Sequence, residues 1–141
     1  MKEKNTDDLC QELMEEPSLD SYLSGNEAYF QEQNPAELLT ALYSRQRISK
    51  AELARRAGMS TVYLHQVLSG KRKPSRDRLL CLCVGLETTL DEAQRILKLT
   101  GFGELYPMRR RDAIIAHGIA HHTPLGEIND ALYAENEKTL Y

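Results

Sequence analysis

The sequence feature that most constrains the fold is a pair of short, capped helices separated by a very short turn. Residues 49–52 match a capping box, in which a Ser and a Glu side chain each bind a backbone N–H at a helix start. Gly58 then permits the left-handed backbone that ends this helix, and Ser60 can cap the next one. The inward side chains of the second helix are expected to be Leu64, Val67 and Leu68. The stretch therefore predicts a helix, a reversal within about three or four residues, and a second helix.

Three further helices are predicted around this pair. Asn34 is suited to the N-cap of a helix that ends near Gln46. Two more helices are expected at about 76–84 and 90–99, where apolar residues recur at helical spacing. Trp is absent, aromatic residues are sparse, and Leu and Ala dominate the apolar residues, which favours helices over strands. We therefore predict an all-α fold with a five-helix core over residues 34–99.

The C-terminal part of the chain resembles the segment before it at an offset of 35 residues. Residues 76–106 align without gaps on residues 111–141, and eight of the 31 aligned pairs are identical. The identical pairs include Arg76/Arg111, Asp77/Asp112, Thr88/Thr123 and Leu105/Leu140. Ordinary composition gives about two identities over this length, although caps and apolar spacing recur in any helical hairpin. On either interpretation the chain ends in a helical hairpin, and on the first this hairpin repeats the preceding one.

Charge is distributed unevenly along the chain, whose net charge is −3. Residues 1–34 carry two basic and nine acidic side chains, residues 35–85 ten basic and three acidic, and residues 86–141 six basic and nine acidic. A basic module between acidic flanks is typical of a protein that binds nucleic acid, although a solvated basic face accounts for the charge equally well. The acidic segment 1–33 is expected to be a weakly structured arm with one or two short helices.

Residues 48–75 contain the motifs of a known family. They are Glu52-Leu53-Ala54, Gly58 with Ser60, and Gly70-Lys71-Arg72-Lys73-Pro74. In residue type and spacing this stretch resembles the lambda-repressor-like, Cro-type helix-turn-helix family, and the resemblance extends from residue 34 to about residue 99. It implies that family's helical fold and binding to double-stranded DNA through the second helix of the motif. The chain departs from the family where many members pair an Arg with a Glu, because Tyr43 and Leu68 stand at those positions and are expected to pack together.

The residues that would contact DNA follow from this resemblance and from the side chains that face outward. Four outward positions of the second helix match the family's base-contacting positions, namely Thr61, Val62, His65 and Gln66. Gln66 is suited to bidentate pairing with adenine, Val62 to contact with a thymine methyl group, and His65 to a bond with guanine N7. Phosphate contacts are expected from the helix starts and the basic loop, namely Ser49, Lys50, Ser60, Tyr63, Lys71, Arg72 and Lys73. The alternative is that the four outward residues are ordinary surface residues.

Together these features predict a sequence-specific, double-stranded DNA-binding transcriptional regulator. It would consist of an acidic N-terminal arm (1–33), a helix-turn-helix DNA-binding domain (34–106) and a C-terminal helical hairpin extension (107–141). The alternative function is a protein-interaction adaptor, or an antitoxin-like partner, that retains the helix-turn-helix fold. A homodimer is expected because one recognition helix reads only a few base pairs. The second hairpin offers it either a dimer surface or a cap for the core, through Ile114, Ile115, Ile119, Ile128 and Leu132.

Other classes of function find little support in the sequence. No catalytic motif is present, so an enzyme is not expected, and neither is a cofactor. Three Cys residues without CxxC spacing, and His117 and His121 without a third ligand, do not predict a metal site. The N-terminus lacks an apolar stretch and the apolar runs are too short to span a bilayer, so a cytoplasmic protein without membrane contact is expected. The acidic arm is expected to cover the basic face, to pack within the fold, or to dock another protein.

Overall fold

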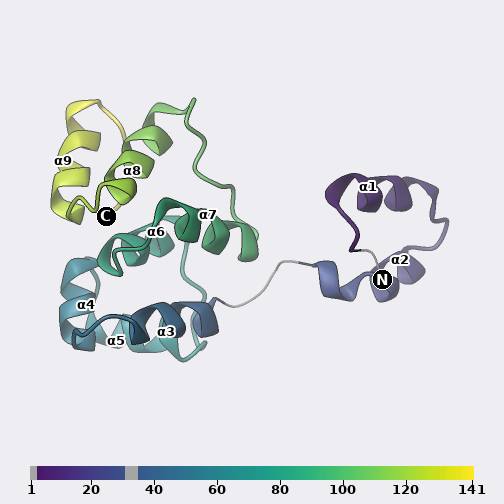
Figure 1. Cartoon of the computed structure of the whole chain (residues 1–141), viewed down its shortest axis with the longest axis horizontal. Helices are drawn as coiled ribbons and strands as arrows, with labels where there is room; N and C mark the ends of the chain where they lie inside the picture. The colour runs from purple at the N-terminus through teal and green to yellow at the C-terminus, as the bar shows by residue number, and fades with distance from the viewer. Residues whose placement is uncertain (1–2, 31–34) are drawn as a thin grey trace. The chain divides into compact units, whose positions relative to one another are not determined.

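The described part of the chain is entirely helical. A computed structural model describes residues 3–30 and 35–141, and over these ranges it contains nine α-helices, one short 3-10 helix and no strand (Figure 1). The contacts divide the chain into two compact units, Met1–Phe30 and Gln31–Tyr141. The prediction of an all-α fold is therefore confirmed.

The first unit is a small helical hairpin with its own polar network. It contains α1 (Thr6–Glu15), α2 (Leu19–Gly25) and a 3-10 turn, Glu27–Tyr29. The Lys4 ammonium group donates to Glu12 Oε2 at 2.7 Å and to Asn26 Oδ1 at 2.8 Å, and Asn26 Nδ2 donates to Glu12 Oε1 at 2.8 Å. Asn26 is 1% exposed. The segment contains two short α-helices, and the sequence does not predict the hydrogen bonds that join Lys4, Glu12 and Asn26.

The second unit is built around α6 (Arg76–Gly85). This helix packs against α4 (Lys50–Arg56) and α7 (Leu90–Leu99), while α5 (Thr61–Leu68) packs against α4 and α3 (Ala36–Ser44). Five consecutive residues of α6, from Leu79 to Cys83, are fully buried. The helix is therefore surrounded on all sides, which explains why it lacks the polar face of an ordinary surface helix.

Helix starts in this unit are set by short hydroxyl side chains. Ser49, Ser60, Ser75 and Thr89 each accept a hydrogen bond from the backbone N–H three residues later, at 3.0–3.2 Å. Gly58 ends α4 with a φ of +63°, as its position in the sequence predicts. Asn34, the expected cap of the first helix, lies outside the described residues, and Pro35 occupies the N-cap of α3.

The capping box predicted at the start of α4 is only half formed. Ser49 caps the helix, but the Glu52 carboxylate turns away from the Ser49 N–H and binds Arg55 at 2.6 Å and Arg56 at 3.2 Å. Hydrogen bonding from Arg55, followed by that from Arg56, lowers the pKa of Glu52 to about 2. Two guanidinium groups one turn further along the helix thus compete successfully with a single backbone N–H.

The second hairpin, α8 (Arg110–Ala120) and α9 (Leu125–Ala134), reproduces the backbone of α6 and α7 at the predicted offset of 35. Positive φ angles occur at Glu87 (52°) and at its equivalent His122 (53°), and again at Gly101 (80°) and Asn136 (57°). Gln94 Oε1 accepts from the Leu105 N–H at 2.7 Å, and in the second hairpin Asn129 Oδ1 accepts from the Leu140 N–H at 2.7 Å. The similarity is therefore a structural repeat and exceeds the recurrence of caps and apolar spacing.

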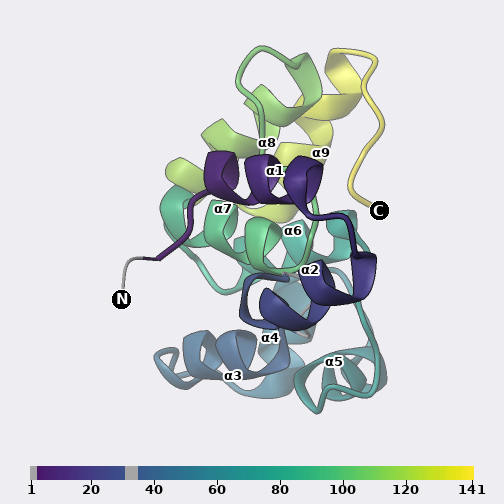
Figure 2. The ribbon, with the colours of Figure 1, turned by 90° about the vertical axis from the view of Figure 1, so that its right-hand side faces the viewer.

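The two hairpins exchange ion pairs at equivalent positions. Arg76 binds Asp112 at 3.3 Å, and Arg111 binds Asp77 at 3.1 Å. Each Arg also donates its Nε to a backbone carbonyl at the end of its own repeat, at 2.9 Å and 2.8 Å. Such reciprocity is that of an isologous contact between two identical units, here formed within one chain. In both views the α8–α9 hairpin lies against the α6–α7 hairpin (Figure 1, Figure 2).

This packing decides between the two roles expected for the second hairpin. Ile115, Ile119, Ile128 and Leu132 are at most 2% exposed, and Ile114 packs against the same core. The expectation that these residues form a dimer surface is therefore wrong, because α6 and α7 already cover them. They cap the core of their own chain.

The equivalence also identifies one face that differs between the hairpins. In α6, Gly85 approaches Leu53 and Ala57 of α4, and the neighbouring Leu82 and Leu86 are buried. The corresponding residues of the second hairpin are Ala120, His117 and His121, and all three are exposed. The rings of the two histidines lie with their centroids 4.1 Å apart and their planes tilted by 35°. Where the first hairpin carries apolar side chains against α4, the second thus presents a polar surface.

Candidate nucleic-acid interface

The outward face of α5 is set by the side chains that α5 buries. Leu64 and Val67 are fully buried and Leu68 is half-buried against the core, as the sequence predicts. Thr61 and His65 are exposed, and Gln66 is half-buried. Val62 is 69% exposed, so its methyl groups are available for contact. The four expected base-contacting residues therefore lie on α5 outside the core.

The expected phosphate-contacting residues lie at three places in the fold. Ser49 and Lys50 begin α4, Ser60 and Tyr63 lie at the start of α5, and the third group follows α5. That group is the basic loop, namely Lys71, Arg72 and Lys73, all of which are exposed. Both serines use their hydroxyl oxygen to cap a helix, so each retains its O–H as a donor for an anion.

Three of the predicted residues are brought together by direct contacts. Arg72 Nε donates to Gln66 Oε1 at 2.9 Å, and the Arg72 backbone N–H donates to the Gln66 carbonyl at 3.2 Å. The Arg72 guanidinium carbon also lies 5.3 Å from the centre of the Tyr63 ring. The basic loop thus folds back onto α5, and Arg72 lies beside a base-contacting candidate.

Arg78 belongs to this group, although the sequence analysis does not identify it. Its guanidinium carbon lies 5.3 Å from the Tyr63 ring, and its Nη1 donates to the Gly58 carbonyl at 3.2 Å. A cation–π contact, such as that between Arg78 and the Tyr63 ring, contributes about 0.5–1 kcal/mol at an exposed site. No signal in the sequence relates Arg78 to Tyr63, because the contact depends on how α5 and α6 both pack against α4.

The residues that replace the family's ion pair both pack against the core. Tyr43 and Leu68 are half-buried there, and the Tyr43 hydroxyl donates to the Ile48 carbonyl at 2.9 Å. Thr40 Oγ1 donates to the Leu68 carbonyl at 3.4 Å, which links α3 to the end of α5. Hydrogen bonds to backbone carbonyls and apolar packing thus connect α3 with its neighbours where an ion pair would otherwise do so.

Comparison with known proteins identifies this arrangement. The sequence model of a family described as a helix-turn-helix domain matches residues 36–96, from the start of α3 into α7. Residues 36–96 are a helix-turn-helix domain. This agrees with the lambda-repressor-like resemblance, and it points to DNA as the partner of the domain. Neither the curated proteins nor the solved structures contain a significant match to the chain.

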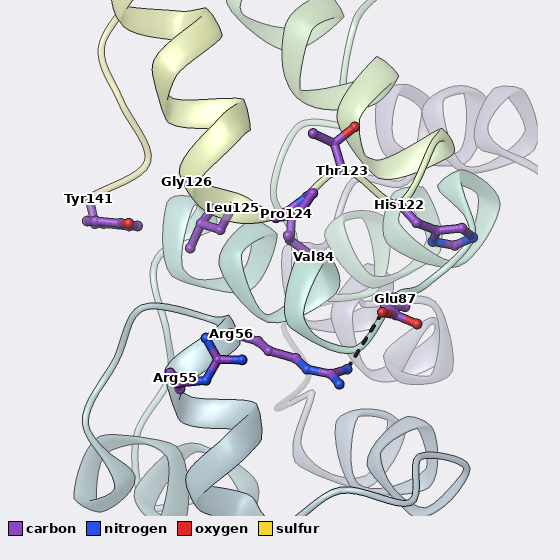
Figure 3. Close-up of a pocket in the computed structure, with 10 residues that line it drawn as sticks. All are labelled: Arg55, Arg56, Val84, Glu87, His122, Thr123, Pro124, Leu125, Gly126 and Tyr141. Atoms are coloured by element: carbon purple, nitrogen blue, oxygen red, sulfur yellow. Dashed lines mark ion pairs between the residues drawn. The ribbon is translucent and has the colours of Figure 1, made fainter.

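A hollow of about 420 Å³ lies between the helix-turn-helix domain and the second hairpin (Figure 3). Arg55 and Arg56 of α4, Glu87, His122 and Tyr141 are among the residues that line it. Arg56 is paired there with Glu87 at 3.6 Å, while Arg55 binds Glu52. Its cationic groups therefore already have partners within the chain, and none of its lining residues is an expected DNA contact.

The remaining polar and sulfur groups add no second site to the helix-turn-helix domain. Within residues 3–30 and 35–141, no three His, Cys, Asp or Glu side chains are grouped as a metal site requires. Burial raises the pKa of Cys81 to about 11 and that of Cys83 to about 12, so both thiols stay protonated at neutral pH. No helix among the described residues is long and apolar enough to cross a membrane.

Proposed function

We propose that this protein is a sequence-specific regulator of transcription that binds double-stranded DNA through α5. The observation that carries the proposal is the outward face of α5, where Val62 is 69% exposed beside Thr61, His65 and Gln66. Short polar and methyl-bearing side chains near the start of a recognition helix are suited to base edges in the major groove. We assign base contacts to these four residues.

We assign phosphate contacts to the helix starts and the basic loop. Ser49 and Lys50 lie at the start of α4, where backbone N–H groups already favour anions. Lys71 and Lys73 are exposed on the loop after α5. Contacts of this kind position a protein on DNA without reading its sequence. We also propose that the protein acts in the cytoplasm.

Selection from a randomised double-stranded DNA library at about 150 mM salt tests this function, since exposed charges are screened there beyond about 8 Å. The full chain is expected to enrich a defined sequence. Val62→Glu places a carboxylate on the outward face of α5, near a helix start where a negative charge is tolerated, and is expected to abolish enrichment without unfolding the protein. Ala131→Glu, which adds the same charge to an exposed position of α9, is the matched control.

We also propose that the protein acts as a homodimer on a two-fold-related site, because one recognition helix covers few base pairs. The dimer surface must differ from the apolar residues of α8 and α9, which the chain buries itself. Sedimentation equilibrium of the free protein and of its DNA complex measures the state directly. A protein that stays monomeric in both would refute the dimer while leaving DNA binding intact.

A protein-interaction adaptor, or an antitoxin-like partner, is the second candidate. The observation that favours it is the surface of the first unit, which is acidic and yet exposes large apolar side chains. They are Leu13, Met14, Leu19, Leu23 and Phe30, between 40% and 79% exposed. Exposed apolar side chains mark a protein-binding surface where they form a contiguous patch. If the protein is an adaptor, Val62→Glu is expected to leave binding to its protein partner unchanged. This separates the adaptor from the leading proposal.

A further inference from the structure

Arg72 forms two hydrogen bonds to one residue of the recognition helix, Gln66. Its side-chain Nε donates to Gln66 Oε1 at 2.9 Å, and its backbone N–H donates to the Gln66 carbonyl at 3.2 Å. The Tyr63 ring, 5.3 Å from its guanidinium carbon, supports it from one side. A phosphate contact on a flexible loop needs no such attachment, because a point charge within reach suffices.

The Arg72 contact fixes which way the Gln66 amide points. A guanidinium group has donors and no acceptor, so the Gln66 atom that faces it must be the carbonyl oxygen. The amide nitrogen, Nε2, is therefore directed away from Arg72. This bond uses Nε of Arg72 and one of the two lone pairs of Gln66 Oε1, so the groups left free are mostly N–H donors: Nε2 of Gln66, and Nη1 and Nη2 of Arg72.

A surface of donors discriminates among bases in the major groove. Guanine presents two acceptors there, N7 and O6, and no donor, whereas adenine presents one acceptor and one donor. A free Gln side chain matches adenine, because it has both a donor and an acceptor. Once Arg72 engages the Gln66 oxygen, the remaining donors, with the two Nη groups of Arg72 among them, match the two acceptors of guanine better than they match adenine.

We propose that Arg72 and Gln66 form one guanine-reading unit, in which Arg72 contacts a base rather than phosphate alone. The inference rests on the proposed function and specifies the base that this part of the interface selects. Tyr63 is a positioning residue for Arg72, and Arg78, bound to the Gly58 carbonyl, holds the same ring. The bases read by Thr61, Val62 and His65 are separate from this unit.

Library selection with the full-length protein and three variants tests the unit. The wild type is expected to select guanine at one position of each half-site. Arg72→Ala, at an exposed residue, is expected to lower the guanine-to-adenine ratio there by about fivefold or more, the lower end of what a bidentate base contact supplies. Gln66→Ala is expected to lower the same ratio. Lys73→Ala, the matched control on the same loop, is expected to weaken binding to all sequences without changing the ratio.

The outcomes separate this inference from the proposed function. If the wild type enriches no sequence, the proposed function itself fails. If it enriches a sequence and Arg72→Ala leaves every base ratio unchanged, Arg72 contacts phosphate and the inference is overturned. A wild-type motif without guanine at any position that responds to Arg72→Ala also overturns it. The Arg72 Nε–H resonance in the free protein provides a check without DNA, because Gln66→Ala is expected to shift it and to speed its exchange with water.

Discussion

Individual side chains of α5 illustrate what sequence can and cannot show about a binding surface. The outward positions Thr61, Val62 and His65 follow from the helical period once Leu64 and Val67 are placed inward, and the structure exposes all three. The bond between Arg72 and Gln66 does not follow from any period. It forms because the loop after α5 folds back, and Arg78 joins the group only through the packing of α6.

Substitutions at Gln66 and Lys73 are expected to separate base reading from charge. Gln66→Ala should weaken binding to the selected DNA by about 1–3 kcal/mol and relax the preferred sequence. Lys73→Ala should weaken binding to every sequence and lower the slope of log affinity against log salt by about one. Both quantities come from titrations of labelled DNA at several salt concentrations. Unchanged affinity in both variants would favour the adaptor.

The Glu52 carboxylate gives the domain a pH-dependent element of stability. Bonds from Arg55 and Arg56 hold its folded-state pKa at about 2, below the ordinary value of 4.5. A depressed pKa contributes stability that is present above the unfolded-state value and lost as the pH falls toward the folded-state value. Glu52→Gln should therefore lower the urea midpoint at pH 7, with the difference from wild type shrinking between pH 4.5 and pH 2. A difference that stays constant over this range would exclude ionisation as its cause.

At the scale of helices, boundaries were predictable and partners were not. Ser49 and Ser60 mark helix starts in the sequence because capping is a local interaction, and α4 and α5 begin directly after them. The place of α8 and α9 was not predictable in this way. It depends on ion pairs and apolar contacts between residues some 35 positions apart, for which the repeat indicates equivalence but not contact.

The two exchanged ion pairs provide a matched test of burial at this scale. The Asp112 side chain is 7% exposed and also accepts the Tyr106 N–H at 2.9 Å, whereas the equivalent Asp77 side chain is 26% exposed. Asp112→Ala should therefore destabilise the fold more than Asp77→Ala, by about 1–3 kcal/mol, because it removes the more buried carboxylate and also leaves the Tyr106 backbone N–H without its acceptor. Urea unfolding of both variants measures the difference. Equal costs would show that solvent reaches both pairs alike.

For the molecule as a whole, the main division is between the acidic first unit and the domain that follows. Residues 1–34 carry nine acidic and two basic side chains, and residues 35–85 carry ten basic and three acidic. The charge asymmetry was evident from the sequence. The internal network of Lys4, Glu12 and Asn26 was not, since it joins residues that are distant in sequence and polar.

Deletion of residues 1–33 is expected to tighten DNA binding, most clearly at low salt. A tethered acidic segment competes with DNA phosphates for the basic loop, although each exposed ion pair contributes only about 0–1 kcal/mol and is screened by salt. DNA affinity and thermal stability of the truncated and full chains are the measurements. Lost stability would indicate a packed arm instead. If neither quantity changes, the segment is a docking site for another protein.

The polar face of α8 limits how this architecture can grow. A hairpin that kept leucines at the positions of His117 and His121 would present to solvent the same apolar stripe that α6 uses against α4. In an open series of stacked units, such a stripe accepts the next unit, whether in the same chain or in another molecule. The two imidazole rings make this surface of α8 polar, so a further hairpin has no apolar stripe to pack against. Polar capping repeats prevent solenoid proteins from polymerising in the same way. The double substitution His117→Leu and His121→Leu should therefore cause self-association through this surface. Light scattering would detect it as a particle size that increases with protein concentration.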